Sequence, residues 1–222
     1  MDTRRITSLA LIVPPVVAMI GWFVVGFVVL DGVGPDDPQK FIAELGANST
    51  AIKYLFPLIT LLFLMAIGGL GYIKKSMEGG PGSYIASFGW FLVILGSAGQ
   101  LGEVASTLAL AEASDNAATA AAAGAADIAT VNSAVASSMY AAGQAIGAVT
   151  TAFSMVGFAL FGVGILQQKN FSPLVAGLII VAGIYTAVMC LIDYENPLIA
   201  VGFIGIVVSF IALGVSLLNQ KD

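Results

Sequence analysis

The chain has 222 residues, of which 59% are hydrophobic and 9% are charged, and its net charge is −5. A soluble domain carries about 25% charged residues, so this composition excludes a water-facing surface over most of the chain. There is no histidine, which excludes imidazole-ligated metal sites and every catalytic pair that uses a histidine base. The sequence has no basic stripe, so no nucleic-acid partner is expected.

Apolar stretches long enough to cross a membrane recur along the chain, since about 20 residues cover roughly 30 Å of hydrocarbon. We predict an all-α, polytopic transmembrane helical bundle that forms one domain, residues 1–222. The six predicted spans are residues 6–30, 54–73, 84–103, 139–166, 173–192 and 197–218. Pro14 and Pro15 lie inside the first span and predict a bend there.

Two segments outside the spans are also expected to be helical. Residues 38–45 begin with proline after Asp37, a suitable N-cap, and Phe41, Ile42 and Leu45 share one face. That pattern favours a short interfacial helix lying on the membrane surface. Residues 104–138 are rich in alanine, which favours helix, so this outer segment is expected to extend the third and fourth spans beyond the membrane.

The positions of lysine and arginine predict the orientation, because cytoplasmic segments carry an excess of these residues. With both termini in the cytoplasm, only Lys40 and Lys53 lie outside. The basic residues that then lie inside are Arg4, Arg5, Lys74, Lys75, Lys169 and Lys221. We therefore expect a multi-pass protein of the cell membrane with both termini cytoplasmic and an acidic outer face.

Small residues line one face of the fourth span at spacings of three and four. They are Gly143, Gly147, Thr150, Ser154 and Gly157. Small residues let helix backbones approach closely in lipid, where no hydrophobic effect drives helices together. This helix-packing face indicates a contact within the chain or, as the alternative, a contact with another subunit.

Three polar residues lie near the outer ends of the third and fourth spans. Gln100 and Gln144 are a candidate intramembrane polar pair, either as a structural hydrogen bond or as part of a solute site. Glu103 shares a helix face with Gln100. The 19 residues from Tyr84 to Gly102 cover about 28 Å, so Glu103 is interpreted as a solvated acid at the membrane boundary, with a functional carboxylate as the alternative.

Two local stretches carry a resemblance to a known family. They are Phe41-Ile-Ala-Glu-Leu-Gly-Ala-Asn48, in a long loop before the second span, and residues 156–166 followed by Phe171-Ser-Pro-Leu174. In these stretches and in its layout, the chain resembles the six-span prokaryotic integral membrane family catalogued as domain of unknown function 4386. The resemblance implies a six-span membrane fold, and it implies no activity and no site residues.

No motif of a known catalytic or cofactor site is present. The sequence contains no His-Glu-x-x-His, no Gly-x-Ser-x-Gly, no phosphate-binding loop and no cysteine cluster. We therefore predict a protein that is not an enzyme, has no cofactor, and contacts the lipid bilayer and other membrane subunits. The favoured function is a structural or accessory subunit of a membrane complex, and the alternative is a channel or carrier for a small neutral or apolar solute.

Overall fold

The computed structural model describes residues 2–219, and these form seven α-helices and no β-strand. The helices are α1 (Thr3–Val24), α2 (Pro38–Ala47), α3 (Ser49–Ser76), α4 (Ser83–Ala122), α5 (Ala126–Gln168), α6 (Pro173–Ile192) and α7 (Ile199–Asn219), and a π-helical turn, η1 (Val25–Val29), follows α1. All of them except α2 are long and apolar enough to cross a membrane. The predicted all-α bundle with six membrane-spanning helices is therefore confirmed.

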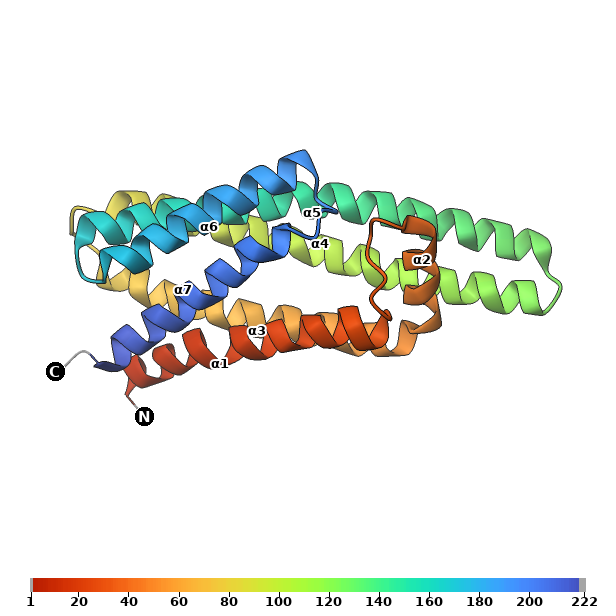
Figure 1. Cartoon of the computed structure of the whole chain (residues 1–222), viewed down its shortest axis with the longest axis horizontal. Coiled ribbons are helices and arrows are strands. Elements are labelled where there is room, and N and C mark those ends of the chain that lie inside the picture. Colours follow the sequence, from red (N-terminus) through yellow and green to blue (C-terminus); the bar gives the residue numbers. More distant parts are fainter. Residues whose placement is uncertain (1, 220–222) are drawn as a thin grey trace.

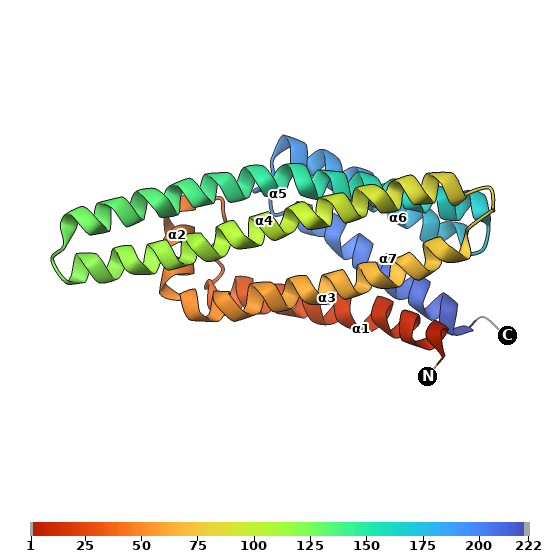
Figure 2. The same cartoon turned by 180° about the vertical axis from the view of Figure 1, so that it is seen from behind.

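The six long helices form a closed ring in the order α1, α3, α4, α5, α6, α7, and each helix packs against its two neighbours in that order. Figure 1 and Figure 2 show this arrangement from opposite sides. Aromatic side chains fill the centre: the rings of Phe158 and Phe210 are 5.5 Å apart, and Phe63 lies 6.1 Å from Phe210. The middle of the ring is a packed core, because both Phe158 and Phe210 are fully buried.

Helix α1 continues through both of its prolines. Pro14 and Pro15 lack the N–H groups that would bond the carbonyls one turn earlier, yet the helix extends to Val24. The change in helix type comes later, at η1, where the wider π-helical turn precedes the loop to α2. The double proline therefore does not end the helix of the first span.

Two helices are much longer than a membrane is thick. At about 1.5 Å per residue, α4 and α5 are roughly 60–65 Å long, about twice the hydrocarbon thickness. Helix α1 begins and α7 ends at one end of the molecule, which we call the terminal end, and α4 and α5 project together from the opposite end (Figure 2). We call residues 104–138 the arm, and Gly124, with a φ of +75°, reverses the chain at its tip. About half of each helix must therefore lie outside the hydrocarbon.

Helix α2 lies across the base of the arm (Figure 1). Asp37 caps it, accepting a 3.3 Å hydrogen bond from the Lys40 backbone N–H, as the sequence predicted. Its apolar face contacts protein: the ring of Phe41 packs against Tyr140 of α5, and Leu45 is fully buried. Ser114 of α4 donates a 2.9 Å hydrogen bond to the carbonyl of Ile42. The face expected to lie on the membrane surface thus holds the arm in place.

Glycine allows close helix contact around the ring. A Cβ placed on Gly89 of α4 would lie 2.6 Å from the carbonyl oxygen of Gly157 on α5, closer than side chains normally approach backbone. The same holds for Gly183 of α6, where a Cβ would lie 2.6 Å from the carbonyl oxygen of Met155 on α5, and for Gly214 of α7, at 2.8 Å from that of Ser8 on α1. Small residues are therefore required at several interfaces, as expected where lipid is the solvent.

Helices α4 and α5 keep one register along the part of their contact that lies in the bundle. Gly82, the N-cap of α4, and Gly89 and Gly96 within α4 recur every seven residues and lie against the carbonyls of Gly164, Gly157 and Thr150 on α5, which also recur every seven. The next α4 positions in this series are Glu103, Leu110 and Ala117. A seven-residue repeat keeps the same faces of two long helices together. The bundle and the arm are therefore parts of one continuous helical hairpin.

We expect Gly89→Ala to lower the free energy of unfolding by about 1–3 kcal/mol, because the added methyl group would press on the backbone of α5. The matched control is Gly177→Ala in α6, where a Cβ would meet nothing within 4 Å. That control should be neutral or slightly stabilising, since alanine favours helix. Thermal unfolding of the purified protein in a mild detergent compares the two, and equal effects would contradict the proposed close contact.

Candidate functional site

The register of α4 and α5 places one acid in an otherwise small or apolar row. Glu103 occupies the position that follows Gly82, Gly89 and Gly96 in the seven-residue series. Its carboxyl group lies over Gly147 of α5, where an added Cβ would be 2.7 Å from both Glu103 Cδ and Oε1. Gly147 was predicted as part of the helix-packing face. Because it has no side chain, the Glu103 carboxylate can occupy the space above it.

The turn between α6 and α7 covers this carboxylate. Tyr194 reaches from the turn to the same glycine, since a Cβ on Gly147 would lie 2.6 Å from Tyr194 Cε1. The Tyr194 hydroxyl donates a 2.9 Å hydrogen bond to Glu103 Oε1. Burial and the nearby Glu103 carboxylate raise the pKa of Tyr194 well above its ordinary value, so the phenol keeps its proton and remains a donor.

The hydrogen bonds continue from Tyr194 into the bundle. Thr151 Oγ1 lies 3.4 Å from the Tyr194 hydroxyl, and Gln100 Nε2 donates a 3.2 Å hydrogen bond to Thr151 Oγ1. Tyr194 uses its only proton for Glu103, so Thr151 must donate in the longer contact. All donors in the series Gln100, Thr151, Tyr194 thus point toward the Glu103 carboxylate. We call these four residues the polar network.

A second tyrosine and acid hold the same turn. The Tyr140 hydroxyl of α5 lies 2.5 Å from Glu195 Oε1 and 2.9 Å from the carbonyl oxygen of Pro35, and its single proton is shared between these two acceptors. Short bonds to an ionised oxygen are among the stronger hydrogen bonds in proteins. The α6–α7 turn is therefore anchored to α5 by Tyr140 and to α4 by Tyr194. The contact of Tyr140 with the Pro35 carbonyl also fixes the loop before α2 to α5.

The two glutamines predicted as a pair do not form a hydrogen bond with each other. Gln100 donates a hydrogen bond to Thr151 and not to Gln144. Gln144 Oε1 is buried and has no hydrogen-bond partner among the described residues. The predicted pairing failed because Thr151 lies nearer to Gln100 in the observed register. Tyr194, which joins Glu103 to Thr151, and Tyr140 carried no sequence pattern that separated them from ordinary boundary aromatics.

Glu103 differs from the solvated boundary acid that was expected. It lies level with the α6–α7 turn, which follows the 20-residue span of α6, but it is half-buried beneath Tyr194. The predicted packing face does face α4: Gly143, Gly147, Ser154 and Gly157 are buried. The seven-residue spacing of Gly82, Gly89 and Gly96 could have placed Glu103 on this buried row from the sequence alone.

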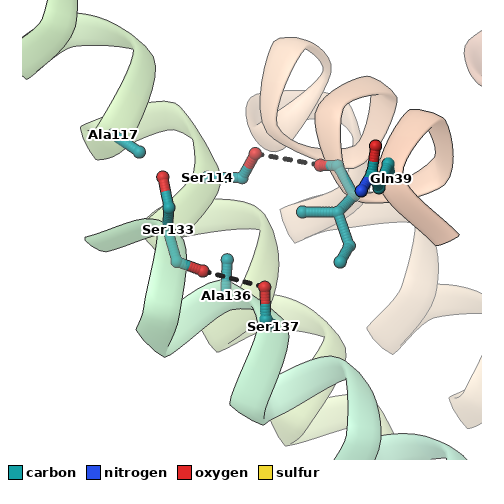
Figure 3. Close-up of a pocket in the computed structure, with 7 residues that line it drawn as sticks. Gln39, Ser114, Ala117, Ser133, Ala136 and Ser137 are labelled. Carbon is teal, nitrogen blue, oxygen red and sulfur yellow. Dashed lines mark hydrogen bonds between the residues drawn. The ribbon is translucent and has the colours of Figure 1, made fainter. Parts of the chain in front are cut away.

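Two pockets lie on the arm, away from the polar network. One, of about 190 Å³, lies between α2 and both helices of the arm, where hydroxyl side chains from α4 and α5 converge (Figure 3). It is lined by Gln39, Ile42, Ser114, Ala117, Ser133, Ala136 and Ser137. Another, of about 350 Å³, is at the arm tip around Gly124 and Asp127. Neither is lined by a residue of the polar network.

No family model, curated protein or solved structure matches the chain. The resemblance to the family of unknown function 4386 therefore stays a prediction. The ring of six apolar helices nevertheless defines the class: the chain is a multi-pass helical integral membrane protein. Within residues 2–219, no group of three or more His, Cys, Asp or Glu side chains is placed to hold a metal ion.

We expect Gly147→Ala to destabilise the protein by about 1–3 kcal/mol, because the methyl group must displace Glu103 and Tyr194. Gly143→Ala is the control within the same GxxxG motif, since a Cβ there meets only Ser106 Cβ at 3.4 Å. A double-mutant cycle with Glu103→Ala tests the cause, because the cost of Gly147→Ala should fall once the carboxylate is gone. An unchanged cost in that background would show that Glu103 does not set the requirement for glycine.

Proposed function

We propose that the chain is a non-catalytic accessory subunit that binds a helix of another membrane protein along α5. The observation that carries the proposal is an exposed series of uncharged residues on α5 at alternating spacings of three and four. It consists of Ile128, Val131, Val135, Ser138, Ala142, Ala145 and Val149. All are exposed except Ala142, which is partly exposed, and we call them the exposed seam.

The spacing of the exposed seam is that of one side of a coiled coil. Three consecutive heptads with apolar or small residues at both core positions are typical of a helix that packs on another helix. Ile128 and Val131 are 58% and 63% exposed although they lie in the arm, outside the hydrocarbon. Lipid cannot cover them there, whereas a partner helix that continues out of the membrane would.

The charge distribution favours a different protein over a second copy. Residues 128–168 contain no charged side chain, and Asp127 lies directly before the exposed seam. In a parallel pairing of two copies, the two Asp127 side chains would lie at the same level and repel each other. A partner that carries lysine or arginine at that level would pair with Asp127 instead.

The proposal includes the orientation predicted from the basic residues. The start of α1, the end of α3 and the turn after α5 lie at the terminal end of the ring (Figure 1). These segments carry Arg4, Arg5, Lys74, Lys75 and Lys169, and Lys221 lies outside the described residues. The arm end carries Lys40 and Lys53. This difference supports a cytoplasmic terminal end and an arm on the outer side of the cell membrane.

We expect Val131→Asp to abolish co-purification of the partner, because a carboxylate would be buried at a core position of the seam. The matched control is Ala118→Asp, also exposed on the arm but on α4. Native mass spectrometry of the protein extracted from its own membrane identifies the bound subunit. Detection of the chain alone, or of two copies alone, would refute the proposed hetero-complex.

A second candidate function is a channel or carrier for a small neutral solute, and the polar network supports it. Gln100 and Thr151 place hydrogen-bonding groups between α4 and α5, and Thr151 is buried. The filled aromatic centre, with Phe158 and Phe210 fully buried, weighs against an open path beyond them. This function therefore ranks below partner binding.

For the second candidate, we expect liposomes containing the protein to take up a small neutral solute faster than empty liposomes. Gln100→Leu should reduce that uptake, since it removes the donor to Thr151, while Gln39→Leu in the arm pocket should leave it unchanged. Uptake equal to that of empty liposomes, across a broad panel of neutral solutes, would rule this function out.

A further inference from the structure

Glu103 is a half-buried carboxylate without a basic partner. Among residues 2–219, the ion pairs join Arg4 to Asp2 and Lys74 to Glu78, and no lysine or arginine lies within 4 Å of Glu103. Its Oε1 accepts one hydrogen bond from Tyr194, and its Oε2 makes none with the described residues. A charge that leaves water is normally paired or bound to a cation, because desolvation alone is costly. Either a proton or a bound cation can neutralise this carboxylate.

A continuous series of hydrogen-bonded oxygen atoms runs from Glu103 through Tyr194 to Thr151, and the Gln100 amide adjoins it. Glu103 Oε1 and Tyr194 Oη are 2.9 Å apart, and Tyr194 Oη and Thr151 Oγ1 are 3.4 Å apart. The Gln100 amide lies 3.2 Å from Thr151, and rotating it by half a turn presents its oxygen in place of its nitrogen. A hard cation with ligands at about 2.4 Å sets neighbouring oxygens roughly 3.4 Å apart, so an ion between Glu103 and Tyr194 would replace their 2.9 Å hydrogen bond and widen that separation.

The charge of this oxygen set matches a monovalent ion. Divalent calcium is normally held by several carboxylates, and the set around Glu103 contains one. Oxygen ligands suit a hard cation, and the single negative charge of Glu103 is balanced by a single positive charge. One turn further along the same two helices, the hydroxyls of Ser97 and Ser154 are buried, at 3% and 2% exposure, and have no hydrogen-bond partner among the described residues. They offer further oxygens next to the site.

We propose that Glu103, Tyr194, Thr151 and Gln100 bind a monovalent alkali cation of about the size of sodium. The ion neutralises Glu103 and fixes the α6–α7 turn against α4 and α5 through Tyr194. Glu195 and Asp193 flank Tyr194 in the same turn and attract cations to this end of the bundle. This inference is independent of partner binding, because it uses the side of α5 that faces α4 and not the exposed seam.

The test is thermal unfolding of the full-length protein in mild detergent at fixed pH and ionic strength, with sodium chloride replaced stepwise by choline chloride. We expect a saturable rise of the unfolding midpoint with sodium, by about 5–10 °C when sodium is about 100-fold above its dissociation constant. Glu103→Gln should remove this dependence, and Thr151→Val should shift it to higher sodium. Glu112→Gln, an exposed acid on the same helix, should retain it.

The outcomes separate the ion site from other roles of Glu103. If Glu103→Gln does not fold, the sodium titration of the wild type and of Thr151→Val still decides the matter. A midpoint that is the same in sodium and choline overturns the proposal, as does a sodium effect that Glu103→Gln retains. A midpoint that responds to pH but not to sodium also overturns it, because Glu103 then binds only a proton.

Discussion

The close backbone contact between α4 and α5 is the constraint on which the rest of the molecule depends. Lipid does not push helices together, so these two must be held by dispersion contacts that only glycine-sized residues permit at this separation. Gly89 and Gly157 lie over each other's carbonyls. The same kind of contact recurs seven residues away on either side, at Gly82 with Gly164 and at Gly96 with Thr150. The arm is a consequence of this register, because the same pairing continues past the end of the hydrocarbon.

The polar network follows from the same contact. Glu103 follows Gly82 and Gly89 in the row of α4 residues that faces α5. Its carboxylate fits there because Gly147 of α5 has no side chain at that point. The α6–α7 turn then closes over it, since Tyr194 and Glu195 point to α4 and α5 from adjacent positions of one short loop. The turn therefore links both helices of the hairpin to the closure of the ring.

Hydropathy alone was sufficient to predict the six spans, because lipid demands long apolar helices whatever their packing. The cap of α2 at Asp37 was equally local and was predicted correctly. The polar network was not, since Tyr194 and Glu103 are 91 residues apart and meet only when α5, α6 and α7 pack in ring order. Gln100 and Gln144 show the same limit: their helices are adjacent, as expected, but a shift of about two turns along α5 brought Thr151 to Gln100 instead.

The two proposed functions of α5 use different sides of one helix. Gly147 and Thr151 face α4 and the polar network, while Ala145 and Val149 belong to the exposed seam, two residues away in each case. A helix this tightly packed cannot shift on one side without moving on the other. If an ion at Glu103 stiffens this part of α5, a partner helix on the seam gains a more ordered surface, and by linkage the partner must strengthen ion binding by the same factor.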